Sequence, residues 1–270
     1  MEKCILRKHF KTVFYEIHST KFSSEFKGCR IAMLCDLHNN EHGEGNKVLL
    51  DEIRKQNPDL VLIGGDMLTA KPREKFDVPL EFLKVLAKEY VVYYALGNHE
   101  YRLKIYPEKY GTMYDTYIGA VKTMGIHLLH NERTLIEING GRFWIYGLEI
   151  DRKYYNRLEH VDMDKRYLED EIDLPPEDEF TVLLAHNPIY FPTYADWGAD
   201  LVLSGHNHGG IIRVPMIGGL ISPQLTLFPK YDVGEFKEGK STMILSSGLG
   251  SHTIKLRIFN PPQLVIIDLK

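Results

Sequence analysis

Cysteine is scarce in this sequence, and its three copies, Cys4, Cys29 and Cys35, form no C-x-x-C pair. An odd number of scattered cysteines does not make a disulfide framework and indicates a reducing compartment. Cys35 stands directly before a candidate metal ligand. We interpret it as a small buried hydrophobe rather than a thiolate, because free cysteines are among the most buried side chains.

Long apolar runs are also missing. No stretch offers the roughly 20 apolar residues that a membrane-spanning helix needs. Residues 1–17 are charged and alternating, without the apolar core of a signal peptide. We therefore expect a cytoplasmic or peripheral membrane protein. Both a soluble protein and one separated from an N-terminal anchor are compatible with this pattern.

The sequence has no large excess of either charge. Its formal net charge is −4 over 270 residues. No broad basic face follows from this balance, so we expect no nucleic-acid partner. The 44% of apolar residues and 26% of charged residues are typical of a globular protein long enough to bury a core. No repeat, low-complexity tract or linker divides the chain, and we expect one domain over residues 1–270.

The sequence does contain apolar strands that alternate with amphipathic helices. Strands are predicted at residues 13–17, 30–35, 60–64 and 91–96, and helices at 46–56 and 78–88. The strand–helix order after residue 30 indicates an α/β fold with a sheet built through helical crossovers. A hairpin around Asn139-Gly140-Gly141, a charged helix within 151–179, and strands at 180–185, 201–204, 241–246 and 263–268 follow.

Five of the predicted strands end in polar side chains that can bind metal. The carboxyl ends of strands line the binding crevice of α/β sheets, so these distant segments are expected to converge. Residues i and i+2 of an extended chain point the same way, so two ligands spaced in this way can reach one point. The candidates are Asp36, His38, Asp66, Asn98, His186, His206 and His208.

This ligand set predicts a centre of two divalent ions. Carboxylate and imidazole suit Mn, Fe or Zn, and the lack of thiolates argues against a structural zinc site. Two carboxylates would leave such a centre with a charge of about +2, which attracts phosphate. We expect Asp66 to bridge the two ions. Asp36, His38 and His208 would complete the ligands of one ion, and Asn98, His186 and His206 those of the other.

Two further polar residues follow Asn98. His99 is not needed as a ligand and is placed to donate a proton to a leaving oxygen or to bind a phosphate oxygen; we prefer this role to simple packing. Glu100 is expected to orient His99 or another neighbour rather than to react.

These motifs, in this order, resemble the calcineurin-like metallophosphoesterases. The resemblance runs from about Arg30 to the end of the chain. The tail motif, Ser247-Gly248-Leu249-Gly250 with Asn260-Pro261-Pro262, is similar to the branch with YkuE-like and UDP-2,3-diacylglucosamine hydrolase-like enzymes. The resemblance implies a four-layer α/β/β/α sandwich, a dimetal site between two sheets, and His99 as general acid. The motifs are Asp36-Leu37-His38, Gly64-Gly65-Asp66, Gly97-Asn98-His99-Glu100, His186 and Gly205-His206-Asn207-His208.

Some positions depart from the family pattern. Cys35 stands where serine is common, Asn39-Asn40 replaces smaller residues, and Glu100 replaces a frequent aspartate. None of these changes removes a ligand. Relatives of this branch often carry an N-terminal membrane anchor, and none is found in this sequence.

The expected function is hydrolysis of a phosphodiester or pyrophosphate bond by metal-activated water. Candidate substrates are small phosphoesters, including a nucleotide or a lipid-linked molecule. The alternative is a phosphomonoesterase. A non-catalytic scaffold is disfavoured, because every ligand and His99 are present.

The segment 211–236 follows His208 directly and is apolar and rich in proline and glycine. One interpretation is an apolar wall for an acyl group, or a lip that contacts a membrane. The other, which we slightly prefer, is a loop packed on the sheet edge. Arg213, Lys230 and Tyr231 are candidate substrate contacts here.

Overall fold

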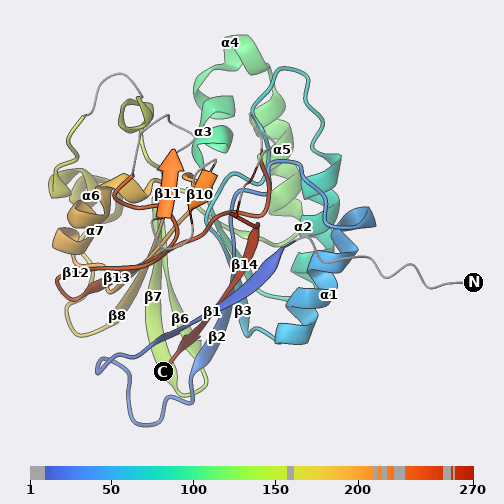
Figure 1. Cartoon of the computed structure of the whole chain (residues 1–270). Helices are drawn as coiled ribbons and strands as arrows, with labels where there is room; N and C mark the ends of the chain where they lie inside the picture. The colour runs from blue at the N-terminus through green and yellow to red at the C-terminus, as the bar shows by residue number, and fades with distance from the viewer. Residues whose placement is uncertain are drawn as a thin grey trace, which may run out of the picture.

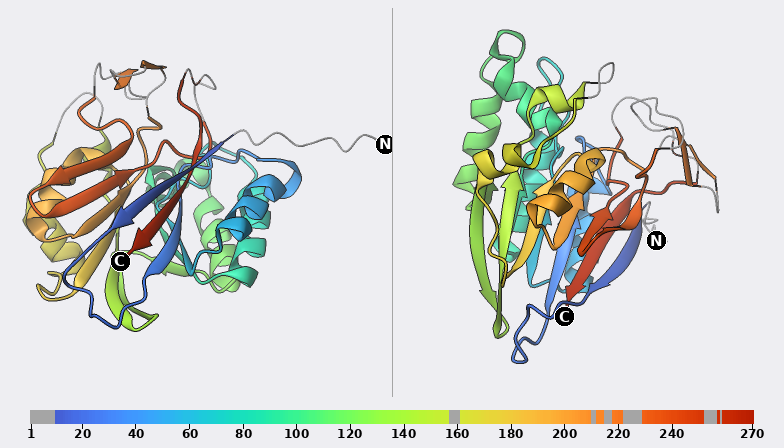
Figure 2. Two further views of the ribbon diagram at one scale, coloured as in Figure 1. Left: turned by 60° about the horizontal axis from the view of Figure 1, so that its bottom comes forward. Right: turned by 90° about the vertical axis from the view of Figure 1, so that its left-hand side faces the viewer.

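Two six-stranded sheets pack face to face in the computed structural model, and helices cover their outer faces (Figures 1 and 2). The structure describes residues 10–156, 161–209, 212–214, 218–221, 229–251, 257 and 259–270, with only the main chain at 212–214 and 218–221.

The first sheet contains the predicted strand–helix crossovers. Strands β2 to β5 are parallel neighbours, whereas β14 runs antiparallel to β2 and parallel to β1. Helix α1 (Lys47–Gln56) connects β2 to β3, and α2 (Asp77–Glu89) connects β3 to β4. The strand order is β1 (Lys11–Ile17), β14 (Gln263–Leu269), β2 (Cys29–Leu34), β3 (Leu60–Ile63), β4 (Val92–Ala95) and β5 (His127–Leu129).

The second sheet contains the predicted hairpin at one edge, where β6 and β7 are antiparallel. Strands β7, β8, β9 and β13 are parallel neighbours, and β12 pairs antiparallel with β13. The order is β12 (Gly234–Glu238), β13 (Ser241–Leu245), β9 (Leu201–Ser204), β8 (Phe180–Ala185), β7 (Gly141–Leu148) and β6 (Glu132–Ile138).

Three apolar layers hold the four structural layers together. Ile31 and Met33 of β2 face the core between the sheets, whereas Ala32 and Leu34 face the core under the helices, as the alternation of a strand requires. Strands buried on both faces explain the continuous apolar runs in the sequence. The predicted α/β/β/α sandwich is confirmed.

Each sheet has its own set of helices on its outer face (Figure 1). The first sheet is covered by α1, α2 and α5 (Met113–Thr123), and the second by α6 (Lys165–Ile172) and α7 (Phe191–Trp197). Between β4 and α5 lie α3 (Asn98–Ile105) and the single turn α4 (Pro107–Tyr110). The short 3-10 helices are η1 (Glu44–Asn46), η2 (Arg152–Tyr155) and η3 (Pro188–Tyr190).

Several elements were not predicted from the sequence. Helix α3 starts at a motif residue, and only His99, Glu100 and Leu103 of it are buried, so it has no clear apolar stripe. A small hairpin of β10 (Ile212–Val214) and β11 (Gly218–Ile221), followed by β12, occupies part of the segment expected to be a loop. Among the described residues, no helix is long and apolar enough to cross a bilayer.

Cys29 and Cys35 are both buried, with free thiols. Burial, the largest influence, raises the pKa of the Cys29 thiol to about 12. It also raises the pKa of the Cys35 thiol well above its usual range. Neither thiol is therefore a thiolate at neutral pH, which agrees with the interpretation of Cys35 as a packing residue. Cys4 lies outside the described residues.

Candidate metal centre

The candidate ligands meet at one end of the two sheets. Asp36 and His38 follow β2, Asp66 follows β3, and Asn98 opens α3. The remaining three follow β8 and β9 in the second sheet. Five of the seven are buried; Asn98 and His206 are half-buried.

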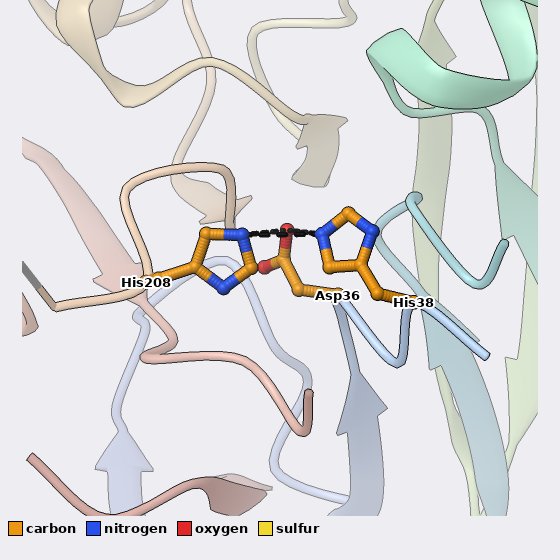
Figure 3. Close-up of side chains that lie close together, drawn as sticks. All are labelled: Asp36, His38 and His208. Atoms are coloured by element: carbon orange, nitrogen blue, oxygen red, sulfur yellow. Dashed lines mark hydrogen bonds and ion pairs between the residues drawn. The ribbon is translucent and has the colours of Figure 1, made fainter. Parts of the chain in front are cut away.

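One cluster surrounds Asp36 (Figure 3). Its Oδ1 lies 3.6 Å from Nε2 of His208 and 3.7 Å from Nε2 of His38, with the carboxylate between the two rings. The ligand atoms of these three residues all lie within 4.8 Å of one another. The two imidazoles come from different sheets, so the cluster joins the two halves of the sandwich.

A second cluster surrounds Asp66. Its Oδ2 lies 3.1 Å from Nε2 of His186 and 3.7 Å from Nε2 of His38. Asp66, His186 and His206 form one compact group, and Asp66, His38 and His99 form another. Asp66 therefore contacts a histidine of the first cluster as well as those of the second.

Hydrogen bonds define the tautomers of two of these histidines. Nδ1 of His186 lies 2.6 Å from the carbonyl oxygen of Gly64, and Nδ1 of His38 lies 3.2 Å from that of Leu68. A carbonyl oxygen only accepts, so each Nδ1 carries a proton, and in the neutral ring Nε2 is the nitrogen with the lone pair. Nε2 of His38 lies 3.1 Å from Nε2 of His208. This is the usual arrangement of a metal-binding histidine and its supporting carbonyl.

His99 has the opposite tautomer. The main-chain N–H of Ala70 donates to its Nδ1 at 2.8 Å, so Nδ1 accepts and Nε2 of the neutral ring carries the proton. Nε2 lies 4.0 Å from Oδ2 of Asp66 and faces the same cluster. A protonated Nε2 does not bind a metal, but it can donate a hydrogen bond to an anion.

The electrostatics of the cluster keep both aspartates ionised. Burial opposes ionisation, but the neighbouring histidines, with His208 foremost at Asp36 and His186 at Asp66, lower the pKa of each carboxyl below its usual range. Burial also opposes a charge on His186, yet Asp66 and Asp36 raise the pKa of His186 to about 10. The two carboxylates therefore favour a positive charge at Nε2 of His186, which either a proton or a bound metal ion can supply.

The main chain at the cluster is unusual. Five candidate ligands have positive φ angles, in the left-handed region that side-chain-bearing residues seldom adopt. Such conformations gather at functional sites, where surrounding structure compensates their cost. The residues and angles are Asp36 (54°), His38 (50°), Asp66 (55°), His206 (69°) and His208 (50°).

Two motif glycines leave room for the carboxylates. A Cβ atom at Gly97 would lie 2.2 Å from Oδ1 of Asp66, and one at Gly205 would lie 2.4 Å from Oδ2 of Asp36. No side chain fits at either position without displacing an aspartate. The glycines of these motifs are thus explained by close approach rather than by turn formation alone.

Glu100 supports the loop that carries Asp66. It is fully buried, and its carboxylate accepts hydrogen bonds from the main-chain N–H groups of Asp66 (2.9 Å), Met67 (2.8 Å) and Gly97 (3.0 Å) and from the Tyr94 hydroxyl (2.7 Å). Burial and the nearby Asp66 raise the pKa of Glu100, while these hydrogen bonds oppose the rise. Glu100 therefore orients Asp66, one of the outcomes expected from its position.

Two residues near His208 were not predicted as part of the site. A guanidinium nitrogen of Arg257 lies 3.3 Å from Nδ1 of His208 and another donates to the carbonyl of Ser247 at 2.7 Å. The side-chain amide of Asn260 donates to the main-chain oxygen of His208 at 2.5 Å. Asn260 belongs to the tail motif, but nothing in the sequence around Arg257 indicates this role.

The candidate substrate contacts after His208 have different surroundings. Lys230 is exposed, with Nζ 4.9 Å from the centre of the Tyr231 ring. Tyr231 is buried, and its ring packs edge-on against Phe191 and Phe236, so core packing accounts for its side chain. The Arg213 side chain and much of the apolar segment 211–236 lie outside the described residues.

The donor set fits metal ions. Oδ1 of Asn98 is buried and has no hydrogen-bond partner among the described residues. Nε2 of His186 also lacks a hydrogen bond of acceptable geometry there, although Asp66 is close. Buried polar atoms nearly always have a partner, and a metal ion would supply one to these two atoms. Together with Nε2 of His38, which lies 3.7 Å from both aspartates, these atoms can bind a cation.

A comparison with protein families identifies the chain. The sequence profile of the family described as calcineurin-like phosphoesterase matches residues 29–210, which contain every candidate ligand. The chain belongs to this family. Its buried clusters of histidine and aspartate are consistent with the dimetal site typical of the family.

Relatives among known proteins agree with this assignment. An uncharacterized metallophosphoesterase of Campylobacter jejuni is 29% identical over 270 residues, which cover 96% of this chain and 63% of that protein. The chain thus spans less than two thirds of that relative. The metallophosphoesterase YkuE of Bacillus subtilis is 25% identical, covering 96% of this chain and 85% of its own. The phosphodiesterase YaeI of Escherichia coli is 28% identical, and the match covers 80% of this chain and 72% of YaeI.

Solved structures also show similarity. The sulfate thiohydrolase SoxB of Thermus thermophilus has a TM-score of 0.49 at 12% identity, covering 82% of this chain and 52% of its own. A dimetal phosphatase of Danio rerio has a TM-score of 0.42 at 12% identity, and the match covers 84% of this chain and 88% of the phosphatase.

Proposed function

We propose that this phosphoesterase is a dinuclear metal-dependent hydrolase of phosphodiester or pyrophosphate bonds in small molecules. The observation that carries the proposal is the meeting of two buried carboxylates with histidines whose Nε2 atoms face them. In two of these histidines, His38 and His186, a main-chain carbonyl oxygen holds Nδ1. The similarity to YaeI, a phosphodiesterase, supports a diester over a monoester. A phosphomonoesterase remains the second candidate.

The proposed ligands divide into two sets that share Asp66. Asp36, His38 and His208 would hold one ion, and Asn98, His186 and His206 the other. Mn, Fe or Zn suits these donors. When bound, the ions would polarise the phosphoryl oxygens and increase the acidity of the attacking water.

His99 would contact the substrate directly. Its Nε2–H faces the cluster and can donate to a phosphoryl oxygen or to the leaving oxygen. Full loss of this proton would leave an imidazolate, because the Ala70 N–H already occupies Nδ1. We therefore favour hydrogen-bond donation to the developing charge over complete proton transfer, a role that has large effects on rate in other enzymes.

An assay with two chromogenic substrates tests the proposal. The purified protein with Mn²⁺ is compared on bis-p-nitrophenyl phosphate and p-nitrophenyl phosphate, with Asp66→Asn as the control. Asparagine tolerates the left-handed main chain at this position, so the variant should fold. We expect metal-dependent turnover of the diester and a loss of at least about 100-fold in Asp66→Asn. No metal-dependent turnover of either substrate would overturn the proposal, and preference for the monoester would favour the second candidate.

A further inference from the structure

A cavity of about 470 Å³ adjoins the metal centre and has three cationic side chains in its wall. Asn98 and His206, both candidate ligands, line the cavity on the side of the centre. Arg102 of α3, Lys109 of α4 and Arg152 of η2 supply the cations. Three separate elements therefore direct positive charge into one space next to the proposed ions.

These cations are not neutralised by acidic neighbours in the described part of the chain. Among the described residues, no aspartate or glutamate lines the cavity. Arg102 donates to the hydroxyl of Tyr110 at 3.1 Å, a neutral partner, and Lys109 lies 5.4 Å from the centre of the same ring. By contrast, Lys104, two residues after Arg102, is paired with Glu149.

The wall that carries these cations is well supported. The Tyr110 hydroxyl also reaches the main-chain oxygen of Ala70 at 3.3 Å, on the loop whose N–H group holds His99. Tyr155 is buried with its ring 5.1 Å from that of His206, and it belongs to the same short helix as Arg152. The cations and the metal centre thus share supporting residues, which favours a fixed spacing between them.

Phosphate is the ligand that this chemistry fits. Arginine forms paired, charge-assisted hydrogen bonds with phosphate oxygens, and lysine adds a point charge. The chain as a whole has a net charge of −4, so this concentration of positive charge is local. An apolar substituent would remove the two guanidinium groups from water without giving them an anionic partner.

We propose that the cavity is an anion subsite that binds a second phosphoryl group of the substrate, beside the one that is cleaved. This inference rests on the proposed function and narrows its substrate class to pyrophosphate-linked or bisphosphorylated small molecules. The second phosphoryl group is either joined directly to the first or carried as a separate ester on the same molecule.

The first test compares two inhibitors of bis-p-nitrophenyl phosphate hydrolysis: inorganic phosphate and the uncleavable methylenediphosphonate. In the unmodified protein we expect the diphosphonate to inhibit about tenfold more tightly. In the double variant Arg102→Gln/Arg152→Gln, the ratio of the inhibition constants of phosphate and diphosphonate should fall below about threefold. Arg166→Gln, an exposed arginine on α6, is the matched control and should retain the tenfold ratio. The diphosphonate chelates metal ions equally with all three proteins, so chelation does not affect the difference in inhibition between them.

The second test distinguishes the two sources of the phosphoryl group. Thymidine 5′-(p-nitrophenyl phosphate) is compared with the same compound carrying a 3′-phosphate. A gain in kcat/KM from the 3′-phosphate that the double variant loses indicates a separate ester. A diphosphonate advantage without such a gain indicates a pyrophosphate link.

Other outcomes overturn the inference or the function beneath it. The subsite would be overturned if phosphate and diphosphonate inhibit equally and the 3′-phosphate gives no gain in kcat/KM. It would also be overturned if the tighter inhibition by diphosphonate or the gain from the 3′-phosphate persists in the double variant. If the protein hydrolyses no diester, calorimetric binding of methylenediphosphonate to the metal-loaded protein replaces the assay. Binding that requires both arginines would then support the subsite although the proposed reaction had failed. An unchanged unfolding midpoint shows that the double variant is folded.

Discussion

The main-chain N–H of Ala70 donates to Nδ1 of His99 at 2.8 Å, whereas Nδ1 of His186 donates to the carbonyl of Gly64 at 2.6 Å. In their neutral forms, two histidines beside the same carboxylate of Asp66 therefore present opposite groups to it, one an N–H donor and the other a lone pair that a metal ion can use. This difference separates substrate contact from metal binding.

Replacement of each histidine by asparagine should affect different properties. His186→Asn should lower the metal content of the reconstituted protein, because it removes a lone pair. His99→Asn should keep the metal content and lower kcat by about 100-fold or more, since it removes only a donor. Elemental analysis and steady-state kinetics on the same preparations measure both effects. Equal metal loss in the two variants would contradict the assignment.

Glu100→Gln should weaken both the fold and the metal site. Both carboxylate oxygens accept from N–H or O–H donors, so an amide NH₂ would face a buried donor. We expect a loss of about 1–3 kcal/mol in the free energy of unfolding. Metal affinity should fall by about 10- to 100-fold. Tyr94→Phe removes one donor and leaves the carboxylate intact, so its effect in urea unfolding and metal titration should be smaller.

Alanine at the motif glycines should remove activity. The new Cβ at Gly97 or Gly205 would collide with the Asp66 or Asp36 carboxylate, and kcat/KM should fall by at least about 100-fold. Gly119→Ala is the matched control, because Gly119 lies in α5 with no neighbour within 4 Å of the added atom. It should retain activity and gain about 0.5–1 kcal/mol of stability. Wild-type activity in Gly97→Ala would refute this account of the motif.

The ion pair of Lys104 and Glu149 should make stability depend on pH. Burial opposes ionisation of Glu149, but His130 and Lys104 lower its pKa in the folded protein. The folded pKa is thus below the unfolded value of about 4.3, so the stabilisation is present above that pH and is lost as the pH falls through the folded value.

Glu149→Gln should therefore be less stable than the unmodified protein at pH 7, by about 1 kcal/mol, and the gap should close as the pH falls below about 4. Urea unfolding at several pH values measures this gap. Glu177→Gln, at an exposed position, is the control and should follow the unmodified protein throughout. A constant gap for Glu149→Gln would show that the stabilisation is not electrostatic.

The sequence predicted the layers and the convergence of the candidate ligands because both depend on local patterns. The apolar runs of β2 and β3 stop directly before Asp36 and shortly before Asp66, and parallel strands bring their ends together. Helix α3 was missed for the related reason that its first turn consists of motif residues, whose polarity hides the helical pattern.

What the sequence could not predict depends on tertiary neighbours. The tautomer of His99 is determined by an N–H group 29 residues away, and Arg257 reaches His208 across 49 residues. The cations of the anion subsite come from α3, α4 and η2, with no motif to connect them. No spacing rule in one sequence contains these contacts.

The left-handed main chain at five candidate ligands has a consequence for the protein without its metals. Each such residue raises the energy of the loops by about 1 kcal/mol or more, and the buried carboxylates there would face one another without cations between them. These loops should then open locally and exchange their amide hydrogens far sooner than β2 or β8 does. Metal supply would thus control how much of the time the reactive end of the protein is formed, while the sheets beneath it persist.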